Sequence, residues 1–141
     1  MAKLPAALEK FVRESKMLDK MMRYMYLIDY GRKLGDFPEE EKTEANRVRG
    51  CTSVVYISSS YQDGKMYYKG FADAQIVRGM VAVLVNSLSG LTPDEIVQID
   101  PDFIKESGIT ESVTPTRQGG FANIFRRMQE DAAPYATVNT N

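Results

Sequence analysis

The segment SVVYISSSYQDGKMYYKGF, residues 53–71, contains two runs rich in β-branched and aromatic residues on either side of Asp63-Gly64. An Asp-Gly pair accepts the positive φ angles at both centres of a tight hairpin turn. The sequence therefore predicts two antiparallel strands, over residues 53–59 and 66–71.

Before this hairpin, KMLDKMMRYMYLIDYGRKLG (residues 16–35) has helical periodicity. Five apolar residues recur at steps of three and four, which predicts an amphipathic helix with one face packed on a core. These residues are Leu18, Met21, Met22, Met25 and Ile28. The next segment, residues 35–47, is acidic and broken by Pro38, so we expect a solvated connection there.

Three helix starts follow the hairpin. Asp73 is a candidate N-cap for a helix that is apolar nearly all round and ends near Gly90, which makes it the expected central helix. Thr92-Pro93, with Glu95 closing a capping box, and Thr114-Pro115 have the form of two further helix starts. The last of these helices has an apolar stripe of Phe121, Ile124, Phe125 and Met128. Helices, a small antiparallel β-sheet and then more helices indicate an α+β fold, with the sheet packed against several α-helices.

Length and composition set limits on organisation and partners. With 141 residues, 43% of them hydrophobic, we expect a single domain over residues 1–141, with its core at roughly 15–132 and a frayed tail at 133–141. The formal net charge of -1 argues against a nucleic-acid partner. No run reaches the roughly 18 apolar residues of a membrane span, so we expect no membrane partner and a cytoplasmic protein.

The residue types exclude several chemistries. Without histidine the chain has no Cys-His dyad, no Ser-His-acid triad and no His-bearing zinc site. With one cysteine it has neither a redox pair nor a thiolate cage for a metal. We therefore expect no metal site.

Cys51, in NRVRGCTSVVYI (residues 46–57), is the remaining candidate. A lone cysteine is commonly a small core hydrophobe. The neighbouring residues favour a reactive, shielded thiol instead: Gly50 gives the backbone freedom, and Arg47 and Arg49 favour the thiolate. The apolar residues expected to shelter it are Val54, Val55 and Ile57.

NRVRGCTSVVYI, the following DGKMYYKGFADAQIVRGMVAVLVNSLSGLTPDEIVQID and the TPTRQGG of residues 114–120 together resemble the SufE family of sulfur-acceptor proteins. The resemblance covers roughly residues 15–130. Two positions depart from the family pattern, with Val54 in place of a polar residue and Tyr56 in place of tryptophan. Both residues follow Cys51 in the sequence. We therefore expect them to alter the pocket and the partner surface, and to leave the acceptor thiol intact.

The resemblance implies a SufE-like fold and a partner, a SufS-like cysteine desulfurase that uses pyridoxal phosphate. Such an enzyme holds sulfur as a persulfide, which Cys51 would accept and pass to a downstream scaffold complex for iron–sulfur cluster assembly. The chain would then be a co-substrate and activator without a cofactor of its own, and not an enzyme. A shielded thiol must also move to receive sulfur, and Gly50 is the expected hinge.

The resemblance also implies roles for two charged residues, Asp73 and Arg117. The residues alone favour a helix cap for Asp73 and leave Arg117 open between a site role and a first-turn surface charge. SufE-like proteins resemble iron–sulfur scaffolds as well, but a scaffold needs about three thiolates. A non-catalytic adaptor that only binds the desulfurase remains the alternative.

Overall fold

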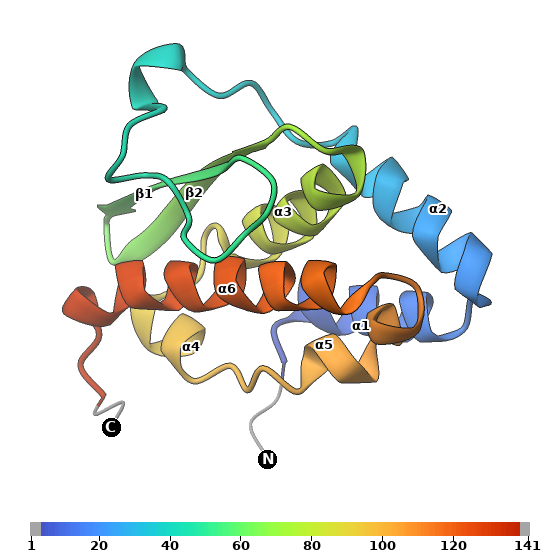
Figure 1. Cartoon of the computed structure of the whole chain (residues 1–141). Coiled ribbons are helices and arrows are strands. Elements are labelled where there is room, and N and C mark those ends of the chain that lie inside the picture. The colour runs from blue at the N-terminus through green and yellow to red at the C-terminus, as the bar shows by residue number, and fades with distance from the viewer. Residues whose placement is uncertain (1–3, 139–141) are drawn as a thin grey trace.

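The computed structural model describes residues 4–138, in which six α-helices accompany a two-stranded antiparallel sheet and cover one of its faces (Figure 1). The helices and strands are α1 (Ala6–Lys16), α2 (Lys20–Gly31), β1 (Val55–Gln62), β2 (Lys65–Ala72), α3 (Gln75–Leu88), α4 (Pro93–Val97), α5 (Phe103–Glu106) and α6 (Pro115–Ala132). Short 3-10 turns lie at Glu39–Glu41 (η1), Ile109–Glu111 (η2) and Ala133–Tyr135 (η3). The α+β class predicted from the sequence is confirmed.

The hairpin turns at Asp63-Gly64, as its residue types predict. Asp63 has φ 52° and Gly64 has φ 81°, so both turn centres lie in the left-handed region. The strands pair in register from Val55 opposite Ala72 to Gln62 opposite Lys65. The hairpin therefore begins four residues after Cys51, and the thiol lies in the connection that leads into β1.

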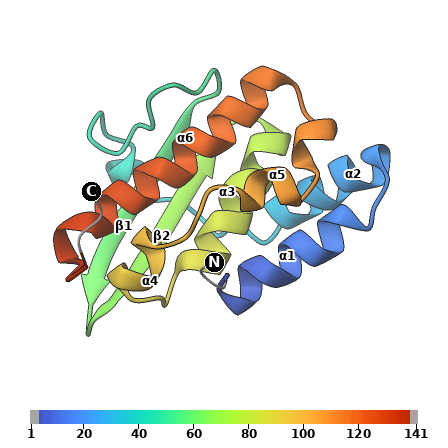
Figure 2. The same ribbon diagram turned by 90° about the horizontal axis from the view of Figure 1, so that it is seen from below.

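Helix α3 is the central element, as expected. It contacts α1, α2, α6 and β2, and Figure 2 shows it between α6 on one side and the α1–α2 pair on the other. Ten of its residues are buried, including Met80, Val81 and Leu84. Helix α6 packs on this core through the predicted stripe, and Phe121, Ile124, Phe125 and Met128 are all buried.

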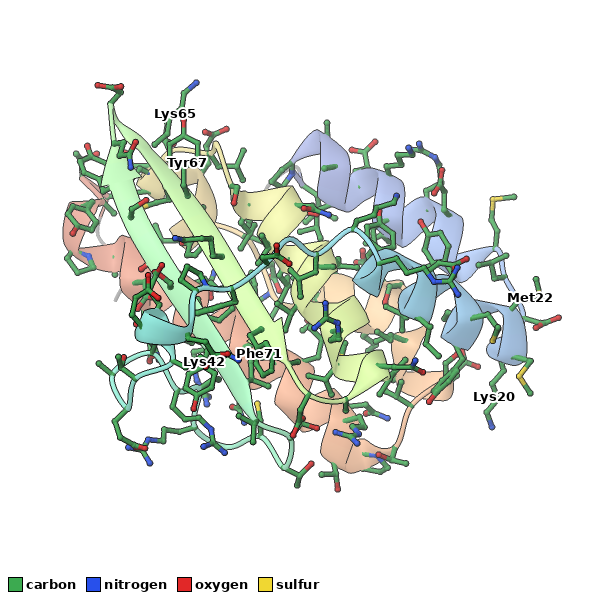
Figure 3. All side chains as sticks on the ribbon, turned by 90° about the horizontal axis from the view of Figure 1, so that it is seen from above. Lys20, Met22, Lys42, Lys65, Tyr67 and Phe71 are labelled. Carbon is green, nitrogen blue, oxygen red and sulfur yellow. The ribbon has the colours of Figure 1, made fainter. Side chains whose placement is uncertain are left out.

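The expected buried face is wrong for the three methionines of α2, whereas Ile28 packs partly buried against the core. Met21 is 70% exposed, and Met22 and Met25 are also exposed, so the methionines face away from the core. Figure 3 shows Lys20 and Met22 at the outer end of α2, pointing away from the body of the molecule. The helix instead buries Arg23, Leu27 and Gly31. Periodicity predicted the helix correctly. It could not tell the two faces apart, because the exposed methionines and the buried residues both recur at steps of three and four.

Arg23 is 5% exposed and joins segments that are distant in the chain. Its guanidinium donates to the carbonyl oxygens of Ser15 (2.9 Å), Leu18 (2.7 Å) and Gly108 (3.0 Å). It also donates to the hydroxyl of Ser112, which itself donates to the carbonyl oxygen of Lys20. A buried charge is tolerated when its donors are satisfied in this way. Arg23 therefore fixes the α1–α2 turn to the segment that leads into α6.

Helix caps follow the sequence at two of three positions. Thr92 and Glu95 form the predicted capping box at α4, and the Thr114 hydroxyl accepts from the Arg117 N–H at α6. The expected cap at Asp73 is wrong, because Ala74 occupies the N-cap position of α3 without a side-chain bond. The Asp73 carboxylate instead accepts from the N–H of Val54, and its own N–H donates to the Val54 carbonyl.

The connection between α2 and β1 is more ordered than its composition predicts. Glu41 pairs with Lys69 at 2.8 Å and accepts from the Ser58 hydroxyl, which fixes the connection to both strands. Lys42 lies over the ring of Phe71 at 4.0 Å, and Figure 3 shows the two side by side. These contacts set the position from which the chain enters the Cys51 loop.

Both ends of the described chain pack on the domain. Helix α1, which lies largely before the expected core boundary at residue 15, buries Leu8, Phe11 and Val12. In the expected frayed tail, Thr137 and Val138 donate to the carboxylate of Asp94, so residues through 138 are held in place. Residues 139–141 lie outside the described part. Across residues 4–138, no helix has the length and apolar character needed to cross a membrane.

Candidate functional site

Cys51 lies in the loop before β1 and is half-buried between α3 and α6. Its thiol donates to the main-chain oxygen of Gly120, with 3.6 Å between sulfur and oxygen. Beside the sulfur is a small cavity of about 10 Å³, large enough for roughly one water-sized group. Its lining comes from three segments: Thr52 and Ser53, Val77 and Met80 of α3, and Thr116, Arg117 and Gly120 of α6.

The expected shelter was assigned to the wrong residues. Val55 and Ile57 are fully buried in the main core, and they do not line the cavity beside the sulfur. The apolar cover comes from Val77 and Met80 instead. Val55 and Ile57 lie on the buried face of β1, so the helices packed against the loop supply the cover instead.

Burial and charge act on the thiol in opposite directions. Burial, the larger effect, raises the pKa of the Cys51 thiol, and the positive charges of Arg47 and Arg117 lower it in part. The resting thiol is therefore mainly protonated at neutral pH. Exposure to water would remove the burial penalty and leave the two arginines to favour the thiolate, so movement of this loop would also activate the nucleophile.

The structure gives different surroundings to the two arginines that precede the Gly-Cys pair. Arg47 lowers the pKa of the Cys51 thiol, and its guanidinium lies 6.0 Å from the centre of the Tyr56 ring. The expectation that Arg49 also favours the thiolate is wrong. The side chain of Arg49 is 81% exposed and pairs with Glu44 at 3.6 Å.

Arg117 is half-buried next to Cys51. From the first turn of α6 its guanidinium donates to the Ser53 hydroxyl, so it is not a free surface charge. It lines the cavity beside Cys51 and is the second positive charge that acts on the thiol. Asp73 lies on the other side of the loop end, where it pairs with the main chain of Val54. Both residues therefore brace the segment between Cys51 and β1.

Gly50 is under two constraints. Its φ of 81° lies in the left-handed region, where a side chain is strained. In addition, a Cβ atom built at this position would clash with Nδ2 of Asn123. Glycine is thus required for the resting position of the loop, in addition to the hinge role expected from the sequence.

Sequence reasoning missed two residues of α6 that bind the Cys51 loop. Asn123 donates to the carbonyl oxygen of Gly50 at 2.9 Å. Arg127 donates to the carbonyl oxygens of Arg47 at 3.2 Å and Ala45 at 2.7 Å. Arg117, Gly120, Asn123 and Arg127 recur at helical steps of three and four, which indicates a shared face. The sequence offers no signal for which segment that face contacts.

Val54 and Tyr56 are the two positions at which the sequence departs from the family pattern described above. Tyr56, which replaces a tryptophan, is half-buried in an aromatic group with Phe37 and Phe71, each 6.1 Å away between ring centres. Val54 is also half-buried. Neither residue lines the cavity beside the sulfur. No group of three or more His, Cys, Asp or Glu side chains within residues 4–138 is placed to hold a metal ion.

Comparison with known families gives a match over most of the chain. The model of the SufE family, described as an Fe-S metabolism associated domain, matches residues 9–132. A SufE-like protein of Synechocystis, itself uncharacterised, is 48% identical over 95% of this chain and 85% of its own length. The family match begins within α1, in agreement with the packing of that helix on the core.

Two longer relatives have more informative names. SufE-like protein 1 of Arabidopsis thaliana, named as chloroplastic/mitochondrial, is 31% identical over 92% of this chain and 35% of its own length. The cysteine desulfuration protein SufE of Plasmodium falciparum is 33% identical over 70% of this chain and 42% of its own length. The chain therefore spans less than half of each of these two proteins.

A solved structure supports the fold. The solution structure of a hypothetical protein from Thermus thermophilus superposes with a TM-score of 0.82, covering 96% of this chain and all of that one. The two sequences are 24% identical, so this likeness concerns the arrangement of helices and strands alone.

Proposed function

This chain belongs to the SufE family, and from that premise we propose that it accepts sulfur on Cys51 from the persulfide of a cysteine desulfurase and activates that enzyme. The observation that carries the proposal is the position of Cys51. The single thiol of the chain lies in a loop next to a cavity, under the charges of Arg47 and Arg117.

The transfer is a thiol–disulfide type exchange. The Cys51 thiolate attacks the outer sulfur of the persulfide on the donor cysteine. One S–S bond forms at Cys51, the S–S bond of the donor breaks, and the donor cysteine leaves as a thiolate that can take up the proton Cys51 has lost. No net oxidation or reduction occurs, so the step needs no redox cofactor on this chain. The chain acts as a co-substrate, and the desulfurase is the catalyst.

Charged groups around the loop have separate tasks in this proposal. Arg117 and Arg47 favour the thiolate once the sulfur leaves its cover. Arg49 and Asp73 are exposed near the loop, and we assign them to the surface that faces the desulfurase. The SufS-like identity of that enzyme, delivery to a downstream iron–sulfur scaffold complex and a cytoplasmic setting are parts of the same proposal.

Intact mass measurement tests the acceptor role. The protein is mixed with a cysteine desulfurase and free cysteine, and both chains are weighed after a single turnover. The wild type is expected to gain the mass of one sulfur atom, whereas Cys51→Ser gains none and still binds the enzyme. If Cys51→Ser stimulated the desulfurase as well as the wild type does, the chain would be an adaptor and not a carrier.

A further inference from the structure

One face of α6 contacts the Cys51 loop, residues 45–53, from the entrance of the loop to its exit. Arg127 binds the entrance of the loop, Asn123 and Gly120 contact its tip, and Arg117 binds its exit. Figures 1 and 2 both show the segment before β1 lying along α6. The helix thus holds a loop that comes from 64 to 82 residues earlier in the chain.

The two ends of the loop are held more firmly than its tip. At the entrance, the Val48 side chain is buried and its N–H donates to the Val55 carbonyl, in addition to the two bonds from Arg127. At the exit, Ser53 is buried and bound by Arg117. The tip, residues 49–52, is bound to α6 through the Asn123 amide at Gly50 and the weak thiol donor at Cys51.

We propose that Asn123 is the latch of the acceptor loop: its side-chain amide holds Gly50, and release of that bond lets residues 49–52 swing and present Cys51 while both loop ends stay fixed. This inference rests on the proposed acceptor role and adds a positioning residue to it. Asn123 acts through Gly50 and has no bond to the sulfur.

Arg126 sets the direction of the latch. It donates to Oδ1 of Asn123, and a guanidinium has no acceptor to offer an amide NH₂ group. The carbonyl end of the amide therefore faces Arg126 and the NH₂ end faces Gly50. The orientation of Asn123 follows from its two partners.

Gly50 allows the latch to close. Its carbonyl reaches Asn123 because the backbone at Gly50 is in the left-handed region and carries no side chain that would displace the amide. A single neutral hydrogen bond at the surface is also easily exchanged for bonds to water or to a partner chain. The latch can therefore hold the loop at rest and still yield to a desulfurase that binds at this face.

The reactivity of Cys51 toward a bulky reagent, dithiobis-nitrobenzoate, tests the latch in the full chain without any desulfurase. Asn123→Ala should raise the rate about two- to tenfold, the range that corresponds to loss of one hydrogen bond. The matched control is Gln129→Ala, which removes another α6 amide that holds main-chain oxygens, those of Ile96 (3.1 Å) and Ile99 (3.0 Å), away from the Cys51 loop. Gln129→Ala should react at the wild-type rate.

Two further readouts separate a latch from general loosening. In Asn123→Ala the apparent pKa of Cys51, taken from the pH dependence of the rate, should fall because the open loop loses its burial. Asn123→Asp keeps the shape of the side chain but cannot donate, and it should also react faster. Its added negative charge disfavours the thiolate, so an increase in this variant cannot come from electrostatics.

The proposal is overturned if neither Asn123 variant reacts faster than the Gln129 control, or if both positions raise the rate equally. The outcome is independent of sulfur transfer. Loss of the carrier role would show in the mass experiment with Cys51→Ser, whereas loss of the latch would show in reagent kinetics of a chain that still accepts sulfur.

Discussion

The thiol of Cys51 lies against the main-chain oxygen of Gly120, so this sulfur rests on a helix that begins more than sixty residues later. A Cβ atom at Gly120 would lie 3.8 Å from this sulfur, which is an ordinary van der Waals distance. The reduced protein therefore has room for a methyl group here, and in the proposed persulfide form the outer sulfur would need the same space.

Gly120→Ala and Gly119→Ala form a matched pair that tests this space. Each should stabilise α6 by up to about 1 kcal/mol, because alanine is the better helix former. A Cβ at Gly119 meets no atom within 4 Å. After loading with polysulfide, Gly120→Ala should lose sulfur to a small thiol faster than the wild type, and Gly119→Ala should match it. Equal loss from both variants would place the outer sulfur elsewhere.

The pH dependence of Cys51 alkylation should distinguish Arg47 from Arg49. Burial penalises the thiolate, so the midpoint of the rate against pH lies above that of an ordinary cysteine. Arg47→Gln removes a charge that favours the thiolate and should move this midpoint further up. Arg49→Gln removes an exposed charge paired with Glu44 and should leave it in place. A larger effect from Arg49 would mean that the loop at rest differs from the one described.

Replacement of Arg23 by methionine should destabilise the protein by about 2–4 kcal/mol. The change keeps a flexible apolar side chain but removes a charged donor from the buried main-chain oxygens of Ser15 and Gly108, which keep only main-chain N–H donors. Arg13→Met is the control, because its pair with Glu9 is exposed and worth less than about 1 kcal/mol. Urea unfolding measures both. If the two variants were equally stable, the buried guanidinium would contribute no net stability.

Helix α2 should tolerate polar residues on its methionine face. Met21→Gln and Met25→Gln should change the free energy of unfolding by no more than about 0.5 kcal/mol, because both side chains are exposed. Leu27→Ala, in the same helix but fully buried, should cost about 2–5 kcal/mol. Thermal unfolding of the three variants is sufficient. A large loss of stability in Met25→Gln would mean that the methionine face is buried, as periodicity predicted.

The sequence predicted those features that neighbouring residues determine. Asp63-Gly64 forms a turn by its own backbone preferences, and the Thr92 box closes within one helical turn, so both were predicted correctly. Asp73 was placed wrongly because a carboxylate before a helix can accept either from the helix or from another strand. Here the main-chain N–H of Val54, nineteen residues away, is the donor.

The surroundings of Cys51 depend on contacts that periodicity does not specify. The spacing of Arg117, Asn123 and Arg127 places them on one face of a helix, but their partners are main-chain oxygens and a hydroxyl of a loop without periodicity. The same limit applies to α2, where three-and-four spacing was assigned to the methionines while Leu27 and Arg23 point inward. The spacing of residues within one helix shows which of them share a face. Which segment that face contacts is determined by tertiary packing.

The cover of Cys51 by α6 also has a consequence for synthesis. The residue whose carbonyl holds the thiol follows it by 69 positions. At elongation rates of about 5–20 residues per second, a nascent chain carries this cysteine for roughly 3–14 s before Gly120 is even joined. During translation the thiol is therefore open to oxidants and electrophiles from which the finished protein shelters it. Newly made chains are expected to be the population in which Cys51 is damaged first.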